Sequence, residues 1–180
     1  MKLNETSLQK LLTENCAEIL RQGASLLENI GDAEFKENGA FGGAIGGHFR
    51  HCLEICDCFL DGIEAGKVDY DRRARNFRLE TDRRYAIERF SETVEKIKNL
   101  SVKSAPKTLF VKPEDTPAEA DFWCESSIER ELEFLTSHTI HHYALIAFKL
   151  QAMNCNVPPE FGVAPSTLRF WHSENPLFRN

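Results

Sequence analysis

Apolar residues recur at helical spacing in four separate stretches of this 180-residue chain. Side chains three or four positions apart share one face of a helix, so each stretch predicts an amphipathic helix with one buried face. The predicted helices span residues 6–30, 44–64, 82–100 and 126–153. Four amphipathic helices joined by short or modest connections predict an all-α fold, a four-helix bundle.

Two other segments break the helical pattern. Between residues 101 and 122 short apolar runs alternate with proline-rich polar sequence, which predicts a short hairpin or extended strand before the last helix. From residue 154 onward the chain is too rich in proline and glycine to form one helix, and its aromatic residues predict an ordered C-terminal strap packed on the bundle. No repeat or linker divides the sequence, so residues 1–180 are predicted to form a single domain.

The composition is typical of a globular protein, with 42% hydrophobic and 28% charged residues. A net charge of −6 gives no general electrostatic reason to bind nucleic acid or an anionic membrane. No apolar run reaches the length of a transmembrane helix, and the N-terminus lacks the apolar centre of a signal peptide. We therefore expect a cytoplasmic protein whose six cysteines stay reduced. Cys52, Cys56 and Cys58 are interpreted as small core residues rather than zinc ligands.

Two histidines on the last predicted helix carry the main chemical signal. His138 and His142 lie four residues apart on its apolar face, where two imidazoles one turn apart can bind one metal ion. The competing interpretation is a pair of hydrogen-bonded core histidines. A third imidazole from a facing helix would favour the metal, and the second predicted helix offers His48 and His51. Spacing does not decide between these two, and helical periodicity slightly favours His48.

Three neutral imidazoles with an open coordination position are typical of a catalytic site for zinc, or for another borderline ion such as nickel or iron. A ferritin-like di-iron centre would need Glu-x-x-His motifs, and no glutamate precedes a histidine by three positions. A hemerythrin-like oxygen carrier would need more histidines and carboxylates in register on all four helices. The pattern therefore predicts a site for one divalent ion.

Four segments resemble the DinB/YfiT-like superfamily of metalloenzymes: GGHFRHCLEICDCFLDG, VDYDRRARN, ERELEFLTSHTIHHYALIAFKL and VPPEFGVAPSTLRF. The resemblance implies an up-down-down-up four-helix bundle that holds zinc or nickel through three histidines. It implies His138 and His142 as the two late ligands and His51 as the early one. His48 is then a further candidate ligand or a partner that orients a ligand.

The same resemblance implies a reaction class, because characterised members of the superfamily include thiol-dependent transferases and an isomerase. A bound metal would activate a low-molecular-weight thiol, most simply for S-transfer to a small-molecule substrate. The catalytic residues are unknown, and Glu131, Arg50 and Arg75 are candidates for polar groups in the pocket. A metal-dependent hydrolase and a non-catalytic bundle that binds a metal or small ligand are the alternatives.

Bundles of this superfamily often pair through helix faces, so the resemblance makes a homodimer one of two options. The last predicted helix carries a second apolar strip that could form such a surface: Phe134, His141, Leu145 and Phe148. The other option is that the C-terminal strap covers this strip.

Overall fold

The computed structural model describes residues 5–38, 43–100, 108–113, 116–117 and 120–174. Most of these residues are helical, so the prediction of an all-α protein is confirmed. The helices are α1 (Glu5–Asn29), α2 (Asp32–Lys36), α3 (Ile45–Ile63), α4 (Arg78–Thr81), α5 (Arg83–Lys98), α6 (Ile128–Ala152) and α7 (Pro165–Glu174), with a 3-10 turn η1 at Tyr70–Arg72. The strands are β1 (Lys67–Val68), β2 (Leu109–Val111) and β3 (Cys124–Ser126).

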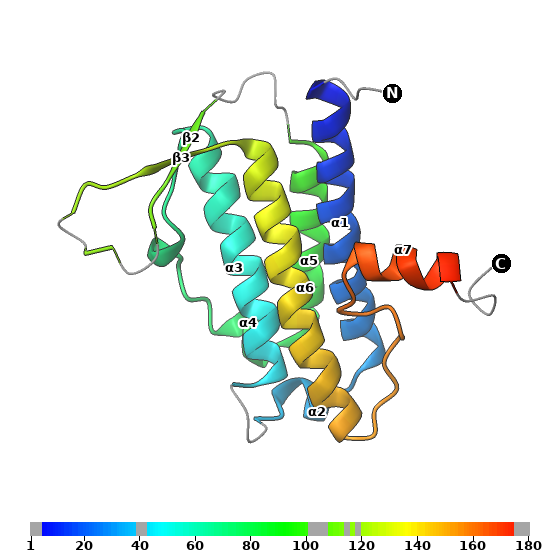
Figure 1. Ribbon diagram of the computed structural model, residues 1–180. Coiled ribbons are helices and arrows are strands. Elements are labelled where there is room, and N and C mark those ends of the chain that lie inside the picture. Colours follow the sequence, from blue (N-terminus) through cyan, green and yellow to red (C-terminus); the bar gives the residue numbers. More distant parts are fainter. Residues whose placement is uncertain (1–4, 39–42, 101–107, 114–115, 118–119, 175–180) are drawn as a thin grey trace.

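The four long helices α1, α3, α5 and α6 lie side by side (Figure 1). In this view α1 and α6 run in one direction and α3 and α5 in the other. Helix α1 packs against α5 and α6, and α3 packs against the same two helices from the other side. The helix positions predicted from periodicity are confirmed to within two residues at each end, which is the usual uncertainty of a helix boundary.

Helix α6 begins two residues later than the start predicted at residue 126. Ser127 is the N-cap, and its side chain accepts a hydrogen bond from the backbone N–H of Arg130. Ser126 ends β3 instead, and its hydroxyl donates to the Glu131 carboxylate at 2.5 Å. The side-chain oxygen that caps a helix must reach the N–H of the second or third helical residue, and Ser127 has that position.

Large aromatic side chains fill the space between the long helices. Phe49 of α3 packs edge-on against Phe90 of α5, with ring centroids 5.7 Å apart, and also contacts Tyr143 of α6 at 5.9 Å. All three rings are fully buried. Cys52 and Cys56 are buried beside them as free thiols, which confirms that they serve as small core residues. Burial raises the pKa of Cys52 to about 12, so this thiol stays protonated and inert at neutral pH.

A small sheet lies beside the C-terminal part of α3 (Figure 1). Strand β2 pairs in parallel with β1 and antiparallel with β3. The predicted extended segment before α6 is thus confirmed at β2, although β3 begins only after residue 122 and residues 101–107 lie outside the described part. Strands of two or three residues are too short to produce a visible alternation in the sequence.

The C-terminal strap packs on α6 through its first half. Phe161 is buried and stacks on Tyr143, with ring centroids 4.5 Å apart. Gly162 has φ +74, and a Cβ there would lie 2.5 Å from the backbone nitrogen of Ala144, so only glycine fits this close approach. The second half forms α7, which was not expected, and it leaves Phe170 61% exposed, so the predicted packing of the strap on the bundle does not extend to this ring. Phe178 lies outside the described residues.

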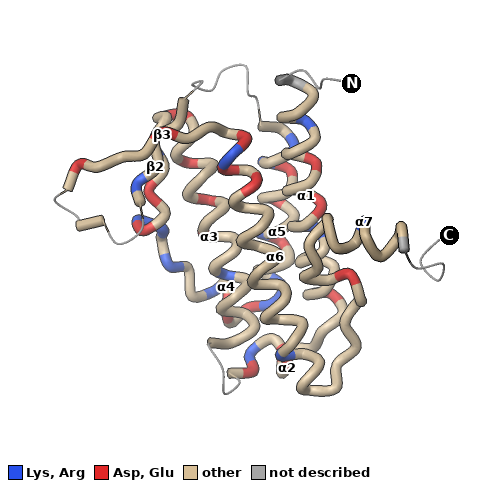
Figure 2. Tube along the Cα trace, viewed as in Figure 1, with Lys and Arg blue, Asp and Glu red and all other residues tan. Residues whose placement is uncertain are grey.

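Acidic and basic positions are interspersed along the long helices (Figure 2). The basic residues Arg72 and Arg73 follow two aspartates, Asp69 and Asp71, so their charge is locally balanced. No helix in the described part of the chain is both long enough and apolar enough to cross a membrane.

Candidate metal centre

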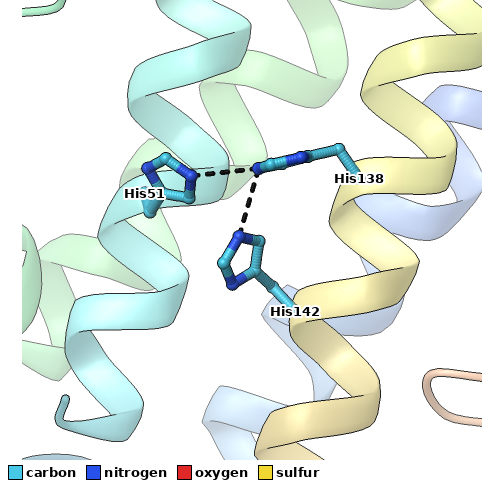
Figure 3. A group of neighbouring side chains, drawn as sticks. All are labelled: His51, His138 and His142. Atoms are coloured by element: carbon cyan, nitrogen blue, oxygen red, sulfur yellow. Dashed lines mark hydrogen bonds between the residues drawn. The ribbon is translucent and has the colours of Figure 1, made fainter. Parts of the chain in front are cut away.

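Helices α3 and α6 bring three histidines together: His51 from α3, and His138 and His142 from successive turns of α6 (Figure 3). The Nε2 atom of His138 lies 3.0 Å from Nε2 of His51 and 3.1 Å from Nε2 of His142. One nitrogen from each ring belongs to a set whose members all lie within 4.8 Å of one another, and all three side chains are partly buried. This group could hold a metal ion.

The size of the group fits a divalent ion with nitrogen ligands. Zinc binds imidazole at about 2.0–2.1 Å, which places neighbouring ligand atoms of a tetrahedron about 3.3 Å apart. The two observed nitrogen–nitrogen distances, 3.0 and 3.1 Å, are a few tenths of an ångström shorter. Small rotations of the three rings would therefore open the required space without moving either helix.

The protein environment lowers the pKa of two of these histidines, His51 and His142. Burial, with smaller contributions from His138 and Arg73, lowers the pKa of His51 to about 4. Burial and the neighbouring histidines lower the pKa of His142 to about 3. An uncharged imidazole has a free lone pair on one nitrogen, which is the form that binds a metal.

His48 also belongs to this cluster, but it approaches from a different side. Its Nδ1 lies 2.9 Å from Nδ1 of His142, whereas Nε2 of His142 faces His138. The two nitrogens of one imidazole point in different directions, so His48 lies across the His142 ring from the three Nε2 atoms. The structure thus brings together all four histidines proposed as ligands and places His51, not His48, among the three that converge.

Two aromatic side chains lie beside His138: Phe134 packs next to it, and Tyr70 packs next to Phe134. The Phe134 ring lies 5.3 Å from the His138 ring on the preceding turn of α6, and Tyr70 packs on the other side of Phe134 at 5.2 Å. Tyr70 could not be predicted from the sequence as a neighbour of the site, because a tyrosine in a short 3-10 turn belongs to no periodic pattern of apolar residues. Its buried hydroxyl donates to Glu131 at 2.7 Å.

The three polar candidates for the pocket have other roles. The Glu131 carboxylate is buried and holds the hydroxyls of Tyr70 and Ser126, so it ties η1 and β3 to α6. Arg50 pairs with Glu80 at 3.1 Å and is close to Glu54 at 3.9 Å. Arg75 is exposed. The structure therefore gives no support for these residues as catalytic groups.

The remaining histidines lie outside the converging group. His141 is exposed on α6, although its ring is 5.3 Å from that of His142, and His172 is exposed on α7. Within the described residues, no other group of histidines, cysteines and carboxylates meets the same distance criterion.

Comparisons with known proteins give little guidance to the function. No family model matches the chain, and no solved structure matches it. A curated protein named FK506-binding protein 5, from Rhizopus delemar, is 36% identical over 103 residues. The match covers 57% of this chain and 27% of the fungal protein. The activity of the whole fungal protein therefore cannot be assigned to this chain.

These comparisons correct one expectation from the sequence. The resemblance to the DinB/YfiT-like superfamily is not supported, since no family model matches and the relative that does match carries a different name. The two longest resembling segments consist largely of apolar helix positions and paired histidines, and unrelated helical proteins can share such patterns. What remains is the group of histidines itself, which follows from the coordinates and needs no family.

Proposed function

We propose that this chain binds one divalent metal ion through the Nε2 atoms of His51, His138 and His142, and that the ion keeps a position open for a small molecule. Zinc is the ion that best suits three neutral imidazoles, with nickel or iron as the nearest alternatives. The four long helices would form a four-helix bundle whose α3–α6 contact carries the site.

One observation carries the proposal. The Nε2 atom of His138 faces two other imidazole nitrogens, at 3.0 and 3.1 Å. A neutral imidazole nitrogen has either one proton or one lone pair, so it cannot make two full hydrogen bonds in the imidazole plane. A central cation satisfies all three lone pairs at once, which supports a metal site over a cluster of mutually hydrogen-bonded core histidines.

The chemistry follows from the donor set. A divalent ion with three neutral ligands supplies Lewis acidity, which lowers the pKa of a bound water or thiol and polarises a bound carbonyl. Helices α3 and α6 hold the ligands on rigid elements, and the Phe134 ring shields one side of His138. We propose a metal-dependent enzyme acting on a small molecule. S-transfer from a thiol is a narrower prediction. It rested mainly on the family resemblance, which the comparisons do not support.

A non-catalytic metal-binding module is the second candidate. It is favoured by the placement of the three polar candidates, since Glu131 binds the hydroxyls of Tyr70 and Ser126, Arg50 pairs with Glu80, and Arg75 is exposed. Hydrolysis and S-transfer would both require the metal, so metal binding is the first property to test.

Metal analysis by plasma mass spectrometry tests the proposal. We expect about one zinc, nickel or iron ion per chain in tag-free protein, and none in the His138→Ala/His142→Ala double variant. Absence of metal from the wild-type chain after reconstitution with each ion would refute the proposal. If metal is present, turnover of ester substrates or of thiol–electrophile pairs would distinguish an enzyme from a binding module.

Location and assembly remain part of the proposal. All six cysteines are free, which supports a reducing compartment such as the cytoplasm. A homodimer would use the outer face of α6, where Leu145 and Phe148 are 38% and 66% exposed beside His141. Phe134 is half-buried against Tyr70 and His138 and would contribute little to that surface. No partner nucleic acid or membrane is proposed.

A further inference from the structure

We infer that His48 is a positioning residue for the metal centre, which accepts a hydrogen bond from Nδ1–H of His142 and thereby directs the Nε2 lone pair of His142 toward the ion. This inference rests on the proposed metal site, because metal binding at Nε2 decides which of the two rings donates. A site preorganised for the ion has the same protonation pattern before the ion binds, so the pattern can be read in metal-free protein. It changes the role of His48 from candidate ligand to hydrogen-bond acceptor.

The first step is the contact itself. Nδ1 of His48 and Nδ1 of His142 lie 2.9 Å apart, the length of a hydrogen bond, and the ring centroids are 5.2 Å apart. Two imidazole nitrogens at this distance with no ion between them share one proton, because two lone pairs would repel and two N–H groups would clash. Either His48 or His142 is therefore the donor.

The other nitrogen of His142 decides which ring donates. A metal-binding Nε2 must be unprotonated, so a neutral His142 carries its proton on Nδ1. That proton points at His48, whose Nδ1 must then be the acceptor, and the neutral His48 ring carries its own proton on Nε2. With its Nδ1 lone pair used in this way, His48 has none left for the ion.

The position of the two residues on α3 explains why both are needed. His48 and His51 are three residues apart and so are neighbours on one side of the helix. From there His51 reaches His138, and His48 reaches the far side of His142. Helix α3 thus supplies one ligand and the support for a second ligand from α6.

The nature of the acceptor has a chemical consequence. Metal-binding histidines are commonly supported by a carboxylate or a backbone carbonyl, and an anionic partner makes the imidazole a stronger electron donor. A neutral imidazole partner adds no charge. An ion held here would be a stronger Lewis acid than one with a carboxylate behind a ligand.

Three variants test the assignment. His48→Phe keeps a ring of similar size but removes the acceptor, whereas His48→Asn places a carbonyl oxygen close to the position of Nδ1. His141→Phe is the matched control, since His141 is an exposed neighbour of His142 outside the converging group. Far-ultraviolet circular dichroism confirms that each variant is folded.

Two measurements are made on each protein. Long-range proton–nitrogen NMR of the metal-free protein reports the tautomer of His142, and competition with a chromophoric chelator reports the zinc Kd. We expect the Nδ1–H tautomer of His142 in the wild type, its loss in His48→Phe, and zinc binding weakened by about 10–100-fold in that variant. His48→Asn is expected to restore both, and His141→Phe to change neither.

Two results would overturn the inference. A His142 tautomer that is the same in the wild type and in His48→Phe would show that His48 does not orient the ring. Loss of bound zinc in His48→Asn as complete as in His138→Ala would identify His48 as a ligand itself. If the wild type binds no zinc but shows the expected tautomers, the proposed function fails while the His48–His142 hydrogen bond stands.

Discussion

Replacing His138 with alanine should abolish the stabilisation of this protein by zinc. His138 lies between the other two ligands, and its Nε2 is the atom that both His51 and His142 approach. An ion that binds only the folded state stabilises that state by about 2.7 kcal/mol when its free concentration is 100 times Kd. The variant would retain at most two of the three nitrogens, and we expect its Kd to rise by a factor of 100 or more.

The size of the effect follows from the length of the chain. With 180 residues, the unfolding entropy near 60 °C is about 0.38 kcal/mol per kelvin. Zinc at 100 times Kd should therefore raise the Tm of the wild type by about 7 °C. At the same zinc concentration a 100-fold weaker site contributes about 0.4 kcal/mol, so the Tm of His138→Ala should rise by only about 1 °C.

Differential scanning calorimetry with and without zinc measures this shift. Each variant is compared with its own chelator-treated sample, so the loss of packing caused by the mutation cancels. A reductant other than a thiol is needed, because zinc binding to the six cysteines of the unfolded chain would reduce the shift. His141→Ala, on the same helix, should behave as the wild type. Equal zinc-induced shifts in His138→Ala and the wild type would refute the proposed ligand set.

Three further outcomes follow from the structure. In metal-free protein, the pKa values of His51 and His142, about 4 and about 3, lie below the 6.5 of an unfolded histidine, so the unfolded chain takes up protons first. Stability should therefore fall as the pH drops from 6.5 toward 4, by at most about 1.4 kcal/mol per pH unit for each group; urea midpoints that stay constant over this range would contradict it. Tyr70→Phe should cost about 1–3 kcal/mol in urea unfolding, because the buried Glu131 carboxylate loses a hydrogen-bond donor; an unchanged midpoint would mean that water replaces the hydroxyl. Gly162→Ala should lower the free energy of unfolding by at least about 1 kcal/mol, since the backbone of α6 lies too close and φ is positive, and a thermal melt equal to the wild type would disprove the close contact.

The long helices could be predicted from the sequence because each repeats its apolar pattern over several turns. The spacing of His138 and His142 likewise predicted that these two rings converge, since both lie on one helix and their proximity needs no knowledge of the fold. The strands and α7 could not be predicted in this way. The strands contain two or three residues each, and α7 follows a proline-rich segment. Pro165 in fact suits the first position of that helix, because an N–H at this position would have no acceptor within the helix.

The third ligand was harder to predict than the first two. His48 and His51 are both close to the apolar face of α3, and a difference of three residues rotates a side chain by only about 60° around the helix. Which ring reaches the centre depends on how α3 crosses α6 and on side-chain rotamers, and neither is encoded in periodicity. Only the coordinates distinguish the Nε2 contact of His51 from the Nδ1 contact of His48.

The division of the ligands between α3 and α6 also matters for folding. His138 and His142 are one helical turn apart, so α6 presents this pair as soon as it is helical. His51 is 87 positions away from His138 and joins them only after the intervening chain has closed into a long loop. A collapsed intermediate with its helices formed but α3 not yet docked would offer two nitrogens where the native protein offers three. The appearance of tight zinc binding during refolding would therefore measure when α3 and α6 dock. It would not measure when the helices themselves form.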